Sequence, residues 1–210
     1  MTKSMQNTNG SQPENKETDI YQERYLKHQK RKAESLTSIY GKKDFKKYSK
    51  KEQDTFFEVL KNRCSQRSFT NEQIDETPIL EAIKTAPSSC DRKGILVKVV
   101  SERNDKDLLS GLLVGGTGWI YRADKILLLI ADMDCYKNPA ERSNMPYLDA
   151  GVLIQTAYLT CEVMNYGCCF VNPNIREENK EFFNNRFGIK ENQIFCGIVA
   201  IGKYNFKHKH

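Results

Sequence analysis

One segment, Lys125–Asp132 (KILLLIAD), places the strongest constraint on how this chain folds. Its six consecutive apolar residues are far fewer than the roughly 20 that a membrane-spanning helix needs. A short, continuous apolar run with charged ends is typical of a central strand that is covered on both faces. The chain must therefore pack other elements on both sides of this strand.

Shorter apolar segments predict three further strands, at 95–101, 168–171 and 196–201. Apolar residues at helical spacing predict helices around 56–60, from 77 to before Pro87, around 108–112, at 146–166 with Gly167 as the C-cap, and around 177–187. The helix at 146–166 has the longest apolar pattern, so we expect it to be central and the most buried.

The order of these elements favours one fold class. Because two helices precede the first strand, we predict an α+β sandwich in which helices flank a central mixed sheet, and not a doubly wound nucleotide-binding fold. The glycine-rich segment 111–118 (GLLVGGTG) follows a predicted helix and lacks the G-x-G-x-x-G spacing. It therefore does not match a dinucleotide-binding fingerprint.

Composition divides the chain into three parts. Residues 1–19 are polar and lack apolar periodicity, so we predict a disordered tail. Residues 20–50 are expected to form a basic helical arm, and 51–210 the globular domain. The segment 24–51 holds eleven basic and two acidic residues, a net charge of +9, whereas the whole chain carries +6. Such an arm could contact nucleic acid or an acidic partner, but a solvated helix with outward lysines is the favoured interpretation.

Cysteine and histidine usage restricts the chemistry. Seven cysteines, an odd number without a C-x-x-C pair, indicate reduced thiols and not a disulfide framework. The three histidines lie near the two ends of the chain, so we predict no metal site. The first residues lack the apolar segment of a signal peptide. We therefore expect a cytoplasmic protein that does not enter a membrane.

The segment 63–69 (RCSQRSF) places two arginines four residues apart with a serine between them. Guanidinium groups form rigid forks of hydrogen-bond donors that suit a phosphate dianion, and a hydroxyl adds another donor. The segment resembles the phosphate-binding motif R-R-S-x-R-x-F of the nitroreductase family. About two dozen residues later, 86–92 (APSSCDR) resembles the segment A-P-S-x-x-N of the same family.

Two later stretches agree with this resemblance. Asp149, Ala150 and Gly151, with Gln155 beyond them, are similar to the D-A-G-x-x-x-Q helix of the family, and 168–173 (CCFVNP) stands where the family has T-C-W-I-G-G. The resemblance covers roughly residues 52–207. It implies a homodimer that binds flavin mononucleotide (FMN) at its interface.

The resemblance also implies which residues contact the cofactor. Those near the phosphate and ribityl chain would be Arg63, Cys64, Ser65 and Arg67, with Lys207 as a further basic residue from the C-terminal tail. Pro87, Ser88, Ser89 and Asp91 would border the isoalloxazine ring. The backbone N–H of Asn172 would point toward N5 and O4 of the ring.

Three departures from the family pattern concern the ring. Asp91 replaces an asparagine, and a carboxylate can accept a hydrogen bond from N3–H of the flavin but cannot donate one. Lys93, Gly94 and Ile95 replace Q-P-W. Pro173 has no N–H to offer where a second donor is expected.

The function implied by the resemblance is an FMN-dependent oxidoreductase that takes hydride from NADH or NADPH and reduces a nitroaromatic, a quinone or a related small acceptor. The altered loop at 91–95 favours an alternative, a specialised flavin enzyme that acts on a dedicated metabolite. A third hypothesis is a non-catalytic flavin-binding protein whose basic arm binds nucleic acid or a partner.

Overall fold

The structure is a computed structural model that describes residues 16–40, 46–70 and 72–206, with backbone alone for 16–19 and 35–40. The chain divides into two compact units, Met1–Tyr48 and Ser49–His210. Among the helices that the structure describes, none combines the length and the apolar character that crossing a membrane requires.

The first unit contains helix α1 (Lys16–Tyr40). It starts four residues before the predicted start at Ile20, so residues 16–19 of the predicted disordered tail are helical. The rest of that tail, residues 1–15, lies outside the described residues. Every side chain from 20 to 34 is exposed. The first unit therefore contributes no buried core within its described part.

The second unit contains a four-stranded sheet in the order β1-β2-β4-β3. Its strands are β1 (Ile95–Val100), β2 (Lys125–Asp132), β3 (Gly167–Val171) and β4 (Gln193–Gly202). All three neighbouring pairs in the described residues are antiparallel. The predicted mixed sheet is therefore corrected to an antiparallel one. The helix crossover does place β2 and β3 parallel, but β4 is inserted between them, so the two strands are not neighbours.

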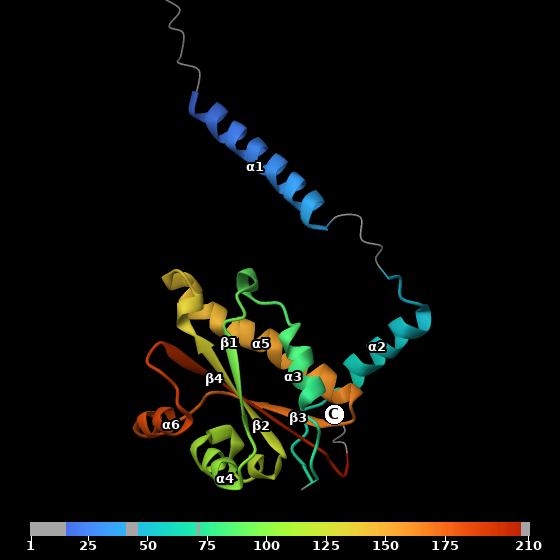
Figure 1. Ribbon diagram of the computed structural model, residues 1–210, viewed down its shortest axis with the longest axis vertical. Coiled ribbons are helices and arrows are strands. Elements are labelled where there is room, and N and C mark those ends of the chain that lie inside the picture. Colours follow the sequence, from blue (N-terminus) through green and yellow to red (C-terminus); the bar gives the residue numbers. More distant parts are fainter. Residues whose placement is uncertain (1–15, 41–45, 71, 207–210) are drawn as a thin grey trace, which may run out of the picture. The chain divides into compact units, whose positions relative to one another are not determined.

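Helices cover both faces of this sheet, as Figure 1 shows, which confirms the predicted α+β sandwich. Helices α3 (Thr77–Lys84) and α5 (Pro139–Val163) pack on one face, and α4 (Arg103–Leu112) and α6 (Lys180–Phe187) on the other. A hydrophobic core lies on each face of the sheet, and alternate residues of β2 point into one or the other. Leu127 and Leu129 face α5, whereas Ile126 and Leu128 face α4 and α6.

Short 3-10 helices and one further α-helix complete the unit. Helix α2 (Lys50–Asn62) begins with a capping box formed by Ser49 and Glu52. The 3-10 helices are η1 (Ser89–Asp91), η2 (Val114–Gly116), η3 (Ile120–Arg122), η4 (Met133–Cys135) and η5 (Glu177–Asn179).

Helix α5 differs from its prediction in two respects. It begins at Pro139 and not at Pro146, because the side chain of Asn138 accepts a hydrogen bond from the backbone N–H of Glu141 at 2.9 Å and caps the helix earlier. It is also not buried on all sides. One face contacts the sheet, whereas Leu148, Val152 and other apolar residues of α5 remain exposed. The apolar pattern counted both faces, and only one of them is buried among the residues that the structure describes.

The segment after α2 crosses the end of the sheet where β3 begins and β4 ends. The backbone N–H of Gln66 donates to the carbonyl of Cys168 at 2.9 Å, and that of Thr70 to the carbonyl of Lys203 at 2.8 Å. A Cβ atom on Gly167 would lie 2.8 Å from Cγ of Gln66, so this close approach requires glycine. The crossing fixes the place of the two arginines at 63 and 67.

Candidate functional site

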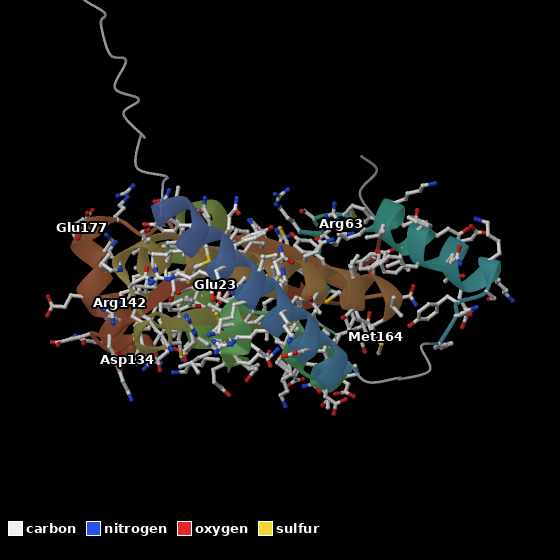
Figure 2. All side chains as sticks on the ribbon, turned by 90° about the horizontal axis from the view of Figure 1, so that it is seen from above. Glu23, Arg63, Asp134, Arg142, Met164 and Glu177 are labelled. Atoms are coloured by element: carbon white, nitrogen blue, oxygen red, sulfur yellow. The ribbon has the colours of Figure 1, made fainter. Side chains whose placement is uncertain are left out.

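Arg63 lies where α2 ends and the chain turns toward the sheet. Its backbone N–H caps α2 by donating to the carbonyl of Val59 at 3.1 Å. Its guanidinium carbon lies 5.2 Å from the centroid of the Tyr158 ring on α5. In Figure 2, Arg63 is labelled where the end of α2 approaches the C-terminal part of α5. The aromatic face attracts the cation and holds it near the helix.

Arg67 is held by a second aromatic ring. Its guanidinium carbon lies 5.8 Å from the centroid of Trp119. That indole is itself fixed, because its N–H donates to the carbonyl of Gly115 at 3.0 Å and its ring stacks on Phe69. Within the residues that the structure describes, neither Arg63 nor Arg67 forms an ion pair with a carboxylate. Both positive charges are therefore available to an anion.

Ser65 belongs to a hydrogen-bonded chain between these two arginines. Its Oγ lies 3.0 Å from the hydroxyl of Tyr158, and that hydroxyl accepts a hydrogen bond from the backbone N–H of Phe170 at 2.8 Å. Burial raises the pKa of Tyr158 to about 12. The phenol is therefore neutral near pH 7 and adds no negative charge to this cationic region.

Two buried cysteines lie next to this chain. Burial raises the pKa of Cys169, and the Arg67 guanidinium opposes that rise. Burial is also the main cause of the raised pKa of Cys168. Both thiols are buried in the sheet and stay protonated at neutral pH, which suits packing better than redox work.

A second polar group lies around the buried carboxylate of Asp149 on α5, which is 7% exposed. One of its oxygens, Oδ1, accepts from both the backbone N–H and the hydroxyl of Ser89 at 2.9 Å. The other, Oδ2, accepts from the hydroxyl of Tyr136 at 3.0 Å. Burial, followed by this hydrogen bond, raises the pKa of Tyr136. Asp149 thereby fastens the segment at 87–91 to the helix.

This segment borders an apolar groove of about 380 Å³ between α3, β1 and α5. Its walls include Leu80, Ile83, Pro87, Ser88, Val97 and Leu153. A smaller hollow of about 250 Å³ is lined by Pro173, Tyr147 and Phe195 among others. The groove, apolar with a few polar groups, has a size typical of small-molecule sites.

Comparisons with known proteins agree with this architecture. The profile of the nitroreductase family matches residues 113–203. An FMN reductase [NAD(P)H] from Bacillus subtilis (strain 168) is 31% identical over 127 residues, which cover 51% of this chain and 50% of the relative.

The chain is similar to the nitroreductase family.

Two solved structures extend the likeness to the fold. NfrA2 of B. megaterium superimposes with a TM-score of 0.66 at 18% identity, covering 74% of this chain and 68% of the other. A protein from Desulfovibrio desulfuricans, solved in complex with FMN, gives 0.62 at 20% identity, covering 74% and 89%. At such identities these structures show the nitroreductase fold alone. The alignment with the curated relative spans about half of that relative's length.

The structure places most of the predicted site residues in two groups. Arg63 and Ser65 contact Tyr158, Arg67 contacts Trp119, and Cys64 between them is buried. Pro87, Ser88 and Ser89 lie around Asp149, and Asp91 is exposed at the outer side of the same loop. Tyr158 and Asp149 are nine residues apart on α5, about 13 Å along the helix.

The structure describes Asn172 but not Lys207. Asn172 is exposed directly after β3, and a Cβ on Gly115 would lie 3.8 Å from its Oδ1. Its neighbour Pro173 lines the smaller hollow. Lys207 lies outside the described residues.

Sequence reasoning missed two side chains that support this site. Tyr158 and Asp149 contact the two segments, yet the sequence predicted no role for either of them there. Asp149 carried a usable signal, because it is a carboxylate among apolar residues on the buried side of a predicted helix. Tyr158 carried none, because a tyrosine in an apolar helical pattern is ordinarily a core residue.

Proposed function

We propose that this chain is an FMN-dependent oxidoreductase that uses NADH or NADPH to reduce a small acceptor such as a nitroaromatic or a quinone. One observation carries the proposal: Arg63 and Arg67 flank Ser65, and neither guanidinium has a carboxylate partner in the described residues. The names of the B. subtilis and D. desulfuricans relatives, which mention FMN, support the same cofactor.

The donor set fits a phosphate dianion. Two guanidinium groups supply fixed forks of N–H donors, and the Ser65 hydroxyl lies between them. Aromatic rings orient both guanidinium groups and do not neutralise their positive charge. The neutral phenol of Tyr158 orients Ser65 and introduces no repulsion. Arg63, Ser65 and Arg67 would thus hold the phosphate end of FMN.

The flavin ring would lie against a loop like the one at 87–91. When bound, FMN supplies the acceptance and delivery of hydride, which no side chain of this chain can perform. The protein contributes binding and orientation: Pro87 and Ser88 form an apolar and a polar edge, and Asn172 offers a backbone N–H. Pro173 offers none, so the ring would lose one donor there.

The separation of the two groups on α5 favours a homodimer with FMN at its interface. Between and beyond Asp149 and Tyr158, the outward face of α5 is apolar: Leu148 is 57% exposed, Val152 40% and Val163 63%. An exposed apolar face of this kind marks a protein interface. Pairing two copies through it would let the arginine pair of one protomer and the loop of its partner share one flavin.

A visible absorption spectrum of the purified protein tests the proposal. We expect flavin bands, release of FMN on denaturation, and bleaching when NADH or NADPH is added without oxygen. A colourless protein that does not take up added FMN at micromolar concentration would contradict the assignment. Comparing the rates at which nitroaromatics and quinones are reduced then identifies the substrate class.

The altered loop at 91–95 supports a second candidate, a flavin enzyme specialised for a dedicated metabolite. Asp91 and Lys93 form an ion pair at 2.9 Å in this loop, so its charge distribution differs from that of the family motif. The two candidates differ in one result. In a specialised dehydrogenase, NADH and NADPH leave the bound flavin oxidised, and only the metabolite reduces it.

A further inference from the structure

We infer that Lys93 is a positioning residue that fixes the carboxylate of Asp91 and compensates its charge beside a bound flavin ring. The inference rests on the proposed function, and it concerns two residues whose types depart from the family motif. Both belong to the described loop between α3 and β1.

Lys93 joins the two ends of this loop. Its Nζ donates to the carbonyl of Ala86 at 2.8 Å and lies 2.9 Å from Oδ1 of Asp91. Its backbone N–H donates to Oγ of Ser88 at 2.9 Å, and the N–H of Asp91 donates to the carbonyl of Ser88 at 2.9 Å. A single side chain thus ties the start of the loop to its tip.

The backbone of this loop needs such restraint. Cys90, Asp91 and Lys93 have φ values of 51°, 55° and 52°, in the left-handed region that residues other than glycine rarely adopt. Conformations of this kind persist only where surrounding contacts determine them, and they cluster at functional sites. Three of them within four residues indicate a turn that is held in one shape.

Two further anchors hold the loop from outside. Arg92 pairs with Glu141 at 2.7 Å and donates to the carbonyl of Cys135 at 3.1 Å. Ser89 is fastened to Asp149 by its N–H and its hydroxyl. These contacts occupy the inward polar groups, whereas the carboxylate of Asp91 is 82% exposed. Asp91 is therefore presented outward from a rigid turn.

The chemistry of a carboxylate at this position explains the need for Lys93. A carboxylate accepts a hydrogen bond from the imide N–H of a flavin ring, but its charge opposes negative charge on the reduced ring. An ammonium group 2.9 Å away cancels most of that charge while leaving the second carboxylate oxygen free to accept. The pair would thus act as a neutral acceptor.

A double-mutant cycle tests the inference. The variants are Lys93→Met, Asp91→Asn and the double variant, measured by FMN affinity from fluorescence quenching and by the midpoint potential of bound FMN. Lys84→Met is the matched control, because Lys84 lines the same groove and has no polar partner in the described residues. We expect Lys93→Met to weaken binding of reduced relative to oxidised FMN roughly tenfold, which is a shift of about −30 mV for a two-electron couple.

In the double variant, the affinity for reduced relative to oxidised FMN should lie within about threefold of that of the unmodified chain. Removing the carboxylate of Asp91 also removes the uncompensated charge. Hydrogen exchange should be faster at the amides of 88–93 in Lys93→Met and unchanged in Lys84→Met. Two outcomes overturn this inference alone. Either Lys93→Met and Lys84→Met bind FMN with the same affinities and potential, or the double variant does not recover the values of the unmodified chain. Failure of the unmodified chain to bind FMN overturns the proposed function together with the inference.

Discussion

The guanidinium carbon of Arg63 lies 5.2 Å from the centroid of the Tyr158 ring, so the end of α2 is coupled to the C-terminal part of α5. The same tyrosine contacts Ser65 and receives the N–H of Phe170. One buried side chain thereby connects the helix, the arginine segment and the third strand. Changes in Tyr158 should be felt in both stability and anion binding.

Arg63→Met should weaken FMN binding by roughly 10- to 100-fold, the loss expected when a charged hydrogen bond to phosphate is removed. Fluorescence quenching measures the affinity. Riboflavin lacks the phosphate, so its affinity should stay the same. Lys61→Met, an exposed cation two residues earlier on α2, is the control. Equal losses for FMN and riboflavin would show that Arg63 does not contact the phosphate.

Tyr158 should make stability depend on pH in the alkaline range. Its folded pKa of about 12 exceeds the ordinary value near 10, so its contribution is complete below pH 10 and is lost as pH rises toward 12. In urea unfolding, the advantage of the unmodified chain over Tyr158→Phe should shrink by roughly 1 kcal/mol between pH 10 and 11. Tyr21→Phe, an exposed change, is the control. A gap that widens with pH would refute the assignment.

Asp149→Ala should lower the free energy of unfolding by roughly 3 kcal/mol, because the N–H and hydroxyl of Ser89 and the hydroxyl of Tyr136 lose their acceptor. Asp149→Asn keeps one acceptor oxygen and should cost about half as much. Urea unfolding at neutral pH measures both. If alanine and asparagine cost the same, the hydrogen bonds are not what Asp149 contributes.

Val152→Arg should convert a dimer into a monomer without unfolding it, because Val152 is already 40% exposed within one chain. Light scattering gives the molecular mass, and thermal unfolding checks the fold. FMN affinity should fall with the dimer, because each flavin would lose one of its two contact groups. Phe182→Arg, on α6 across the sheet, is the control at another exposed apolar position. A dimer that survives Val152→Arg would place the interface elsewhere.

Local patterns predicted most elements because their signals lie within a few residues. The strand at Lys125–Asp132 has the predicted bounds, and β1 differs by one residue. Strand β4 starts earlier than its apolar run, at Gln193, because its first residues pair with Ala131 and Asp132 beyond a bulge. At that bulge Gly197 has φ +118°, and a Cβ there would lie 2.6 Å from Phe170. Pairing with a distant strand, not local preference, extends this strand.

The amino-acid sequence by itself predicted the α+β class, because apolar periodicity is a property of neighbouring residues, and its resemblance to family motifs singled out the segments at 63–69 and 86–92. The tertiary structure alone decided that the strand pairs in the described residues are antiparallel, that Asp149 and Tyr158 contact these two segments, and that the two side chains stand nine residues apart on α5. Which side of a helix meets a loop depends on how the helix crosses the sheet. That crossing is set by packing between residues far apart in the chain.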